Sequence, residues 1–201
     1  MGSSTGSATN PVFVVTGTSG AGKGTLEKAL LSQMPELELA VSATTRERRD
    51  GEQDGREYWF ISDKEFDEKL RDSEFLEHVE FPWGQRSGTL RSEIERIREE
   101  GRVPLLDLEP KGALEVKQTV PGAVTIFVEA PSFEENERRL RARATESEGE
   151  IEDRLDLARE QLEQAGEFDY LVVNDDLDRA LRELTEIVRG KLSSAGTMSR
   201  P

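Results

Sequence analysis

Gly17-Thr-Ser-Gly-Ala-Gly22-Lys23-Gly24-Thr25 is the stretch that decides the fold. Residues 11–16 (PVFVVT) before it form a short apolar run, which is typical of a strand buried on both faces. Residues 22–34 after it carry apolar side chains at helical spacing and stop before a proline. A glycine-rich loop between a buried strand and a helix predicts a phosphate-binding loop (P-loop) on a parallel sheet.

In such a loop the backbone N–H groups wrap around phosphate oxygens and the lysine reaches the β- and γ-phosphates. The spacing G-x4-G-K is satisfied, but Gly24 stands where the strict pattern has Ser or Thr. We therefore expect the hydroxyl of Thr25, one place later, to help hold Mg²⁺ through the phosphates and water. A ligand-free turn is the disfavoured alternative. The expected ATP-binding residues of the loop are Gly17, Ser19, Gly20, Ala21, Gly22, Lys23, Gly24 and Thr25.

Composition narrows the function further. The 201 residues include 42 acidic and 27 basic side chains, a formal net charge of −15, which disfavours a nucleic-acid or anionic-membrane binder. The chain has no cysteine and a single histidine, so thiolate chemistry is excluded and a histidine metal site is disfavoured. No apolar run approaches the ~18 residues that span a bilayer, and the first ten residues do not resemble a signal peptide. We expect a cytoplasmic protein.

Alternating strand and helix patterns predict an α/β fold, with a P-loop NTPase-type parallel sheet flanked by helices. Further strands are expected at residues 103–108, 124–129, 170–173 and, less plainly, 39–42. Helices are expected at residues 92–98, 110–118, 132–144, 151–165 and 177–192. The Ser- and Gly-rich ends, residues 1–10 and 193–201, are interpreted as disordered tails around a single domain, residues 11–192.

The polar, arginine-rich stretch at residues 42–60 (SATTRERRDGEQDGREYWF) interrupts the alternation. Its Arg46 and Arg49, three apart beside hydroxyls and a later phenol, can form a fork-shaped cradle for a phosphate. A solvated turn is the alternative, with the arginines paired to Glu47, Glu52 and Asp54.

This stretch resembles the guanylate kinase pattern S-x-T-T-R-x-x-R-x-G-E-x-x-G-x-x-Y-x-F, and the resemblance extends over residues 12–188. It implies a core at residues 11–41, 90–137 and 166–192, an inserted NMP-binding subdomain at 42–89 and a helical lid at 138–165. It also implies that the GMP phosphate is held by Ser42, Arg46, Arg49 and Tyr58.

The same resemblance assigns the guanine contacts. Glu77, in Phe75-Leu-Glu77-His78, matches the glutamate that bonds the guanine edge, and one carboxylate can accept from both N1–H and the 2-amino group. Thr89 matches a hydroxyl near the base. Asp107 matches a carboxylate near the nucleotide and metal, and Glu109 stands for an aspartate that contacts the guanine amino group. Ser87 replaces a tyrosine that donates to the GMP phosphate, so Arg86 is expected to supply that contact, unless the phosphate is held more weakly or the acceptor differs.

Four arginines, Arg138, Arg139, Arg141 and Arg143, lie within six residues of this acidic chain. Like charges four apart on a helix repel unless an anion lies between them, although pairing with Glu135 and Glu150 is an equal alternative on spacing alone. The resemblance implies that Arg139, Arg143 and Arg154 close over the transferring phosphoryl group. It also places Asn174 near the ATP adenine.

We therefore expect an enzyme, a nucleoside-monophosphate kinase that phosphorylates GMP and dGMP by direct in-line transfer from ATP with Mg²⁺ as cofactor. The expected catalytic residues are Lys23, Arg46, Arg139, Arg143 and Arg154. The expected partners are these small-molecule substrates alone, without nucleic acid or membrane, in a monomer or homodimer. The alternatives are a same-fold kinase acting on another phosphorylated acceptor and a noncatalytic guanylate-kinase-like protein-interaction module.

Overall fold

The computed structural model describes residues 11–81, 84–142 and 148–197. At its centre lies a five-stranded sheet in which every pairing is parallel, as the sequence predicts. The strand order is β2 (Leu37–Leu39), β7 (Val103–Asp107), β1 (Phe13–Gly17), β8 (Val124–Glu129) and β9 (Tyr170–Val173). Because β1 is central and pairs Val15 with Asp107, the P-loop leaves the sheet beside the carboxyl end of β7.

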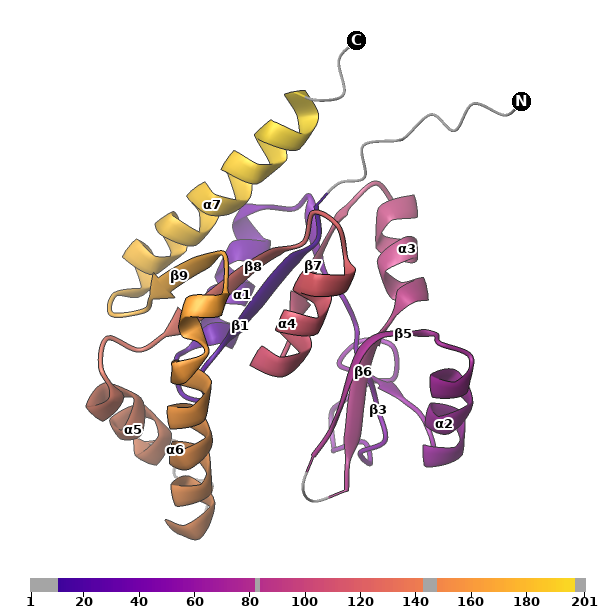
Figure 1. Ribbon diagram of the computed structural model, residues 1–201, viewed down its shortest axis with the longest axis horizontal. Coiled ribbons are helices and arrows are strands. Elements are labelled where there is room, and N and C mark those ends of the chain that lie inside the picture. Colours follow the sequence, from indigo (N-terminus) through magenta and orange to yellow (C-terminus); the bar gives the residue numbers. More distant parts are fainter. Residues whose placement is uncertain (1–10, 82–83, 143–147, 198–201) are drawn as a thin grey trace.

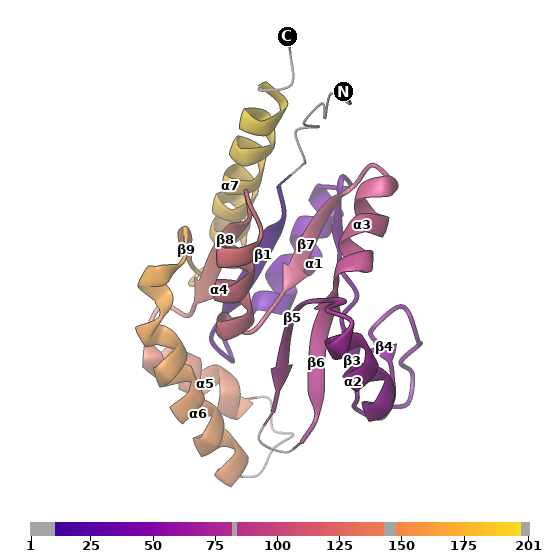
Figure 2. The ribbon, with the colours of Figure 1, turned by 45° about the vertical axis from the view of Figure 1, so that its right-hand side comes forward.

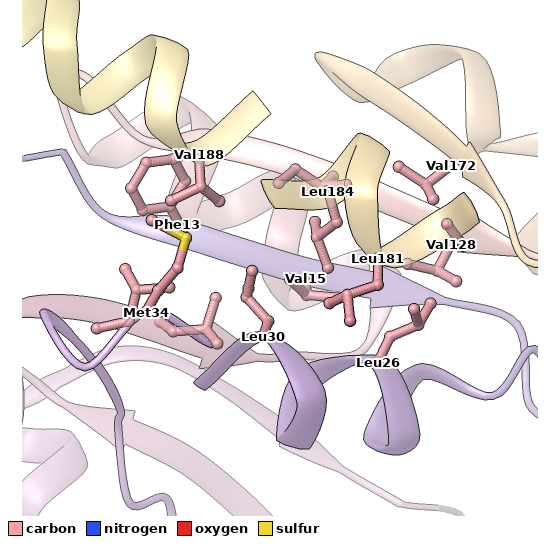
Figure 3. Close-up of a cluster of buried hydrophobic side chains, with 14 of the residues drawn as sticks. Phe13, Val15, Leu26, Leu30, Met34, Val128, Val172, Leu181, Leu184 and Val188 are labelled. Carbon is pink, nitrogen blue, oxygen red and sulfur yellow. The ribbon is translucent and has the colours of Figure 1, made fainter. Parts of the chain in front are cut away.

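Helices cover both faces of this sheet, because side chains alternate along each strand. Phe13 and Val15 of β1 join one apolar cluster, and Val12 and Val14 join the other. Figure 3 shows the first cluster, in which β1 packs against α1 (Lys23–Gln33) and α7 (Leu177–Thr197). The opposite face is covered by α3 (Arg91–Glu99) and α4 (Pro110–Thr119) (Figure 1).

A second sheet is built entirely from the inserted stretch. Its strand order is β4 (Trp59–Phe60), β3 (Ala43–Thr44), β6 (Arg86–Leu90) and β5 (Phe75–Glu80). Helix α2 (Asp63–Arg71) packs on one face through Phe66, whose ring centroid lies 4.4 Å from that of Phe75. The helix begins at a capping box in which Ser62 accepts from the Glu65 backbone N–H and the Glu65 side chain bonds back. The insert therefore has a small core of its own.

Two further helices, α5 (Phe133–Ala142) and α6 (Glu148–Glu163), follow β8 and meet through Leu140, Ile151 and Leu155. A short 3₁₀ turn (Ala165–Glu167) leads from α6 into β9. In both views α5 and α6 lie at the same end of the molecule as the insert (Figures 1 and 2). That end is also the one to which the carboxyl ends of the strands point, where ligands bind in open α/β sheets.

Two of the element boundaries expected from the sequence are wrong. The fifth strand is Leu37–Leu39, not residues 39–42, because the chain turns toward the insert where the Ser42 carbonyl accepts from the Trp59 N–H. The expected tail from residue 193 is helical as far as Thr197, since α7 continues. The expected tail at residues 1–10 lies outside the described residues, and the boundaries of core, insert and lid stay a prediction. None of the described helices is long and apolar enough to cross a membrane.

Candidate active site

The P-loop is shaped by a positive backbone φ angle and by the close approach of the Asn174 side chain. Gly22 has φ of +86°, and a Cβ there would lie 2.5 Å from Nδ2 of Asn174. Only glycine adopts this conformation without strain or collision. Gly22 is also the N-cap of α1, so the free N–H groups and the positive end of the helix face the loop. The sequence pattern correctly predicts the strand, loop and helix around this position.

Lys23 points back toward β7. Its Nζ lies 2.5 Å from Oδ1 of Asp107 and donates to the Leu108 carbonyl at 3.4 Å. Burial alone lowers the pKa of Lys23, but the carboxylates of Asp107, Glu27 and Glu109 outweigh it and leave that pKa raised. Lys23 is therefore a fixed cation at the point where the phosphates are expected.

Glu27 is a member of this cluster that the sequence analysis missed. It follows Lys23 by one helical turn and is 4% exposed. Burial, the neighbouring Asp107 charge and a hydrogen bond with Asp107 raise the pKa of Glu27 to about 8, against the lowering effect of Lys23. The raised pKa favours the protonated form of Glu27 near neutral pH. The only signal in the sequence is a carboxylate four residues after the loop lysine.

A hollow of about 460 Å³ opens beside the loop. Asn174 lies at its edge, 7% exposed, and its Nδ2 donates to the Ala21 carbonyl at 2.7 Å. Thr25 is exposed on the first turn of α1 and lines the same hollow. The full lining set is Gly20, Gly22, Thr25, Arg138, Arg139, Ala142, Asn174, Asp175 and Leu177. The expected donor-site residues from three distant parts of the chain therefore meet here.

Arg139 already reaches the P-loop. Its guanidinium donates to the carbonyls of Ala21 at 3.5 Å and Asn174 at 3.0 Å, and its Nε donates to Glu135 at 2.7 Å. Glu135 also accepts two hydrogen bonds from Arg138, and these arginines lower its pKa to about 2. The pairing with Glu135 is thus confirmed for Arg139, and the binding of an anion by this arginine cluster stays a prediction.

A second expected lid arginine, Arg154, also reaches the P-loop. Arg154, on α6, lies 3.5 Å from the Ser19 hydroxyl, to which its Nη1 donates. The structure therefore brings Arg154 to the P-loop, more than a hundred positions away in the sequence. Arg143 lies outside the described residues.

The arginine-rich loop of the insert is held by Glu52. Arg46 donates to its two oxygens at 3.0 and 2.8 Å, and the Arg49 N–H donates at 2.8 Å. The Arg46 guanidinium also lies 5.3 Å from the Tyr58 ring centroid. Glu52 thus places Arg46 against Tyr58 and leaves the Arg49 side chain exposed. The alternative interpretation, in which these arginines pair with acidic residues, is confirmed for Arg46, which pairs with Glu52. Asp54 pairs with neither arginine in the described contacts and instead accepts a hydrogen bond from the Phe60 N–H.

Ser42 immediately precedes β3, and Ser87 lies on the neighbouring strand β6. The Ser42 carbonyl accepts from Trp59, and the Ser87 hydroxyl donates to the Ala43 carbonyl at 2.9 Å. Ser87 is opposite Val79 and Thr89 is opposite Glu77, so Ser87 and Thr89 share one face of the second sheet.

The expectation for Arg86 is wrong. Arg86 lies on the opposite face of β6 from Ser87, because neighbouring side chains alternate along a strand. It donates to Asp67 at 2.5 Å and Asp63 at 2.7 Å, and its guanidinium lies 4.6 Å from the Phe66 ring centroid. Arg86 therefore ties α2 to the sheet and does not supply the phosphate contact expected of it.

The buried carboxylate of Glu77 packs against the first turn of α4, the helix whose N-cap is Glu109. Glu77 is 4% exposed and accepts from the Thr89 N–H at 2.9 Å, and burial raises its pKa despite that bond. A Cβ at Gly112 would lie 2.7 Å from Oε2 of Glu77, so α4 can approach only because that position is glycine. Glu109 is the N-cap of the same helix. Its Oε2 accepts from Nε2 of Gln161, on α6, at 2.9 Å, a partner that the sequence analysis did not identify.

Known proteins of one family resemble this chain over most of its length. The family model described as guanylate kinase matches residues 9–191. A guanylate kinase of Synechococcus elongatus is 49% identical over 173 residues, which cover 86% of this chain and 94% of the relative. One of Rubrobacter xylanophilus is 47% identical over 178 residues, 89% and 93% of the two chains. The solved guanylate kinase of Anaplasma phagocytophilum superposes with a TM-score of 0.73 at 28% identity, covering 92% of this chain and 87% of its own.

Proposed function

Since this chain belongs to the guanylate kinase family, we propose that it transfers the γ-phosphoryl group of ATP to GMP, giving ADP and GDP. The chain is an enzyme, a nucleoside-monophosphate kinase, and the relatives that support this match it over nearly their whole length. A same-fold kinase for another acceptor and a noncatalytic interaction module are not favoured. The proposal extends to dGMP, because the residues proposed for the acceptor are assigned to its base and its phosphate.

The observation that carries the acceptor assignment is the buried carboxylate of Glu77, which packs against the first turn of α4 at Gly112, while Glu109 is the N-cap of that helix. Guanine presents N1–H and a 2-amino group on one edge, and two carboxylates are suited to accept these hydrogen bonds. Adenine offers no such pair of donors. A buried carboxylate left without its donor costs free energy, so a purine that lacks them is rejected.

Each charged group has a proposed role in an in-line transfer. Lys23 stabilises negative charge on the β- and γ-phosphates, and Arg46 with Arg49 and Tyr58 holds the acceptor phosphate. Arg139 on α5 and Arg154 on α6 are proposed to stabilise charge on the transferring phosphoryl group, and Arg143 is expected to share this role. Closure of these helices also excludes water, which would otherwise compete with GMP as the acceptor. No covalent enzyme intermediate is required.

The donor atoms present fit a Mg²⁺ ion. Thr25 is exposed at the edge of the hollow, so its hydroxyl can contact the ion directly or through water, as a hard oxygen ligand. Gly24 leaves open space beside it, since a Cβ there would meet nothing within 4 Å. When bound with ATP, Mg²⁺ neutralises charge on the phosphate oxygens.

A panel of acceptors tests the proposal. The protein is assayed with ATP and Mg²⁺ against GMP, dGMP, AMP and UMP, and ADP formation is followed by a coupled assay. We expect GMP and dGMP to react with kcat/KM at least ~10³-fold above that for AMP, the discrimination typical of a site that bonds a substrate N–H. Preference for another nucleotide would favour the same-fold kinase, and no reaction with any of them would favour the interaction module.

Several expectations remain proposals. We infer that GMP-binding residues are Ser42, Arg46, Arg49, Tyr58, Glu77, Ser87, Thr89, Asp107 and Glu109, and that Asn174 lies near the ATP adenine. The cytoplasmic location, the monomeric or dimeric state and the expected lack of nucleic-acid and membrane partners stay predictions from the sequence.

A further inference from the structure

We infer that Gln161 is a positioning residue for the acceptor base: its hydrogen bond directs the Glu109 carboxylate and so sets the preference for a purine that carries a 2-amino group. This inference rests on the proposed function, because it assigns the 2-amino group of the acceptor to Glu109. Gln161 itself is not required to touch the nucleotide.

The side chain of Gln161 is unusual for its location. It is 5% exposed, its Nε2 donates to Oε2 of Glu109 at 2.9 Å, and its Oε1 has no hydrogen-bond partner in the part of the chain that the structure describes. A buried amide oxygen without a partner destabilises the folded protein, and an apolar side chain of similar size would avoid that cost. Packing therefore does not explain a glutamine at this position, whereas its donor group has a specific acceptor.

Glu109, which accepts this hydrogen bond, needs a partner to hold its carboxylate in one orientation. Glu109 is exposed and lies just before the first turn of α4, so its carboxylate can rotate about three side-chain torsions. Ordering such a side chain costs conformational entropy. The hydrogen bond from Gln161 occupies Oε2 and leaves Oε1 to accept from the substrate.

Helix α6 connects this contact with the donor site. Arg154, Ala158 and Gln161 are spaced i, i+4 and i+7, so they share one face of the helix. Arg154 contacts Ser19 of the P-loop, Ala158 is fully buried, and Gln161 contacts Glu109. Two turns of helix, about 10 Å, separate the two polar contacts. One rigid element thus fixes both an arginine at the phosphates and the carboxylate at the base.

The test compares GMP with IMP, which lacks the 2-amino group. Gln161→Met keeps the length of the side chain and removes the donor together with the unpartnered oxygen. We expect the ratio of kcat/KM for GMP to that for IMP to fall about tenfold, the effect of one hydrogen bond to a charged group, with the loss on the GMP side. Gln164→Met is the matched control, because it makes the same change at a glutamine that has no described bond to Glu109, and it should leave the ratio unchanged.

A double-mutant cycle separates this role from a structural one. In a Glu109→Ala background, Gln161→Met should change the GMP to IMP ratio less than twofold, because Glu109 is the group through which it acts. Equal losses on GMP and IMP, or an unchanged ratio, would overturn the inference. The wild-type protein is measured first: if it does not phosphorylate GMP, the proposed function fails, whereas a working wild type with an unaltered ratio in Gln161→Met refutes only the role of Gln161.

Discussion

Lys23 and Asp107 form an ion pair at 2.5 Å between the P-loop and the end of the neighbouring strand. Their side chains are 18% and 42% exposed, so the pair lies at the border of the core and the hollow. The pairing follows from the sheet, because β1 and β7 are adjacent and place Val15 opposite Asp107. The lysine is therefore oriented by the protein before any phosphate is present, which reduces the reorganisation needed during transfer.

Removing the loop cation should abolish most of the turnover. Lys23→Met keeps the length of the side chain and deletes the charge, and we expect kcat to fall about 10²–10³-fold, as for loss of a main electrostatic contact to the transition state. Steady-state kinetics with saturating ATP and GMP measure this. Lys28→Met, on an exposed position of the same helix, is the control. Undiminished turnover in Lys23→Met would contradict the assigned mechanism.

Glu27 makes stability depend on pH. Its pKa is raised from 4.5 to about 8 in the folded protein, so between these values the folded state holds a proton that the unfolded state releases. Stability then falls as pH rises through this window, by at most about 1.4 kcal/mol per pH unit. Glu27→Gln removes this dependence.

The stability gained in Glu27→Gln should therefore grow from pH 5 to pH 8 and level off above. Urea unfolding of both proteins across this range, without nucleotide and Mg²⁺, measures the difference. A constant difference between the two proteins would show that Glu27 is ionised in the folded state.

Arg46 should not be replaceable by lysine. Its two hydrogen bonds to Glu52 and its position near Tyr58 depend on a planar, forked guanidinium. We expect Arg46→Lys to lower kcat/KM for GMP about 10–100-fold, the equivalent of ~1.5–3 kcal/mol, with little change in KM for ATP. Arg48→Lys, at an exposed neighbouring position, is the matched control. Equal effects at the two positions would argue against a phosphate cradle at Arg46.

Arg139 should act on the chemical step. It contacts the carbonyls of Ala21 and Asn174 at the edge of the hollow, so its loss should remove charge stabilisation near the transferring phosphoryl group. We expect Arg139→Met to lower kcat about 10²–10³-fold while KM for GMP changes less than about threefold. Arg141→Met is the control, since Arg141 pairs with Glu137 on the same helix. Single-turnover kinetics distinguish slow transfer from slow product release.

Arg86 should matter for stability and not for GMP. Its guanidinium is 14% exposed and joins Phe66 to two largely exposed aspartates. Because solvent screens such pairs, we expect Arg86→Met to cost only about 1 kcal/mol, a Tm decrease of roughly 2–4 °C. KM for GMP should stay within about twofold of the wild type, and the exposed Arg71→Met should alter neither quantity. A large rise in KM for GMP would restore Arg86 to the acceptor site.

Local patterns in the sequence determine the strand, loop and helix around Gly22 and Lys23, because backbone conformation there depends on neighbouring residues. They also determine the parallel sheet, since runs buried on both faces alternate with amphipathic helices. The proposed phosphate cradle around Arg46 and Arg49 could be predicted for the same reason, because its arginines and hydroxyls lie within one short stretch.

Only the tertiary structure decided which of these charges meet. Arg86 and Ser87 are adjacent in the sequence, but the pleat of β6 sends them to opposite faces, and α2 supplies carboxylates to one of them. The raised pKa of Glu27 depends on Asp107, which the adjacency of β1 and β7 brings near it, and the hydrogen bond between Gln161 and Glu109 joins residues 52 positions apart. The strength and partner of a charge depend on burial and long-range packing, which local sequence patterns do not encode.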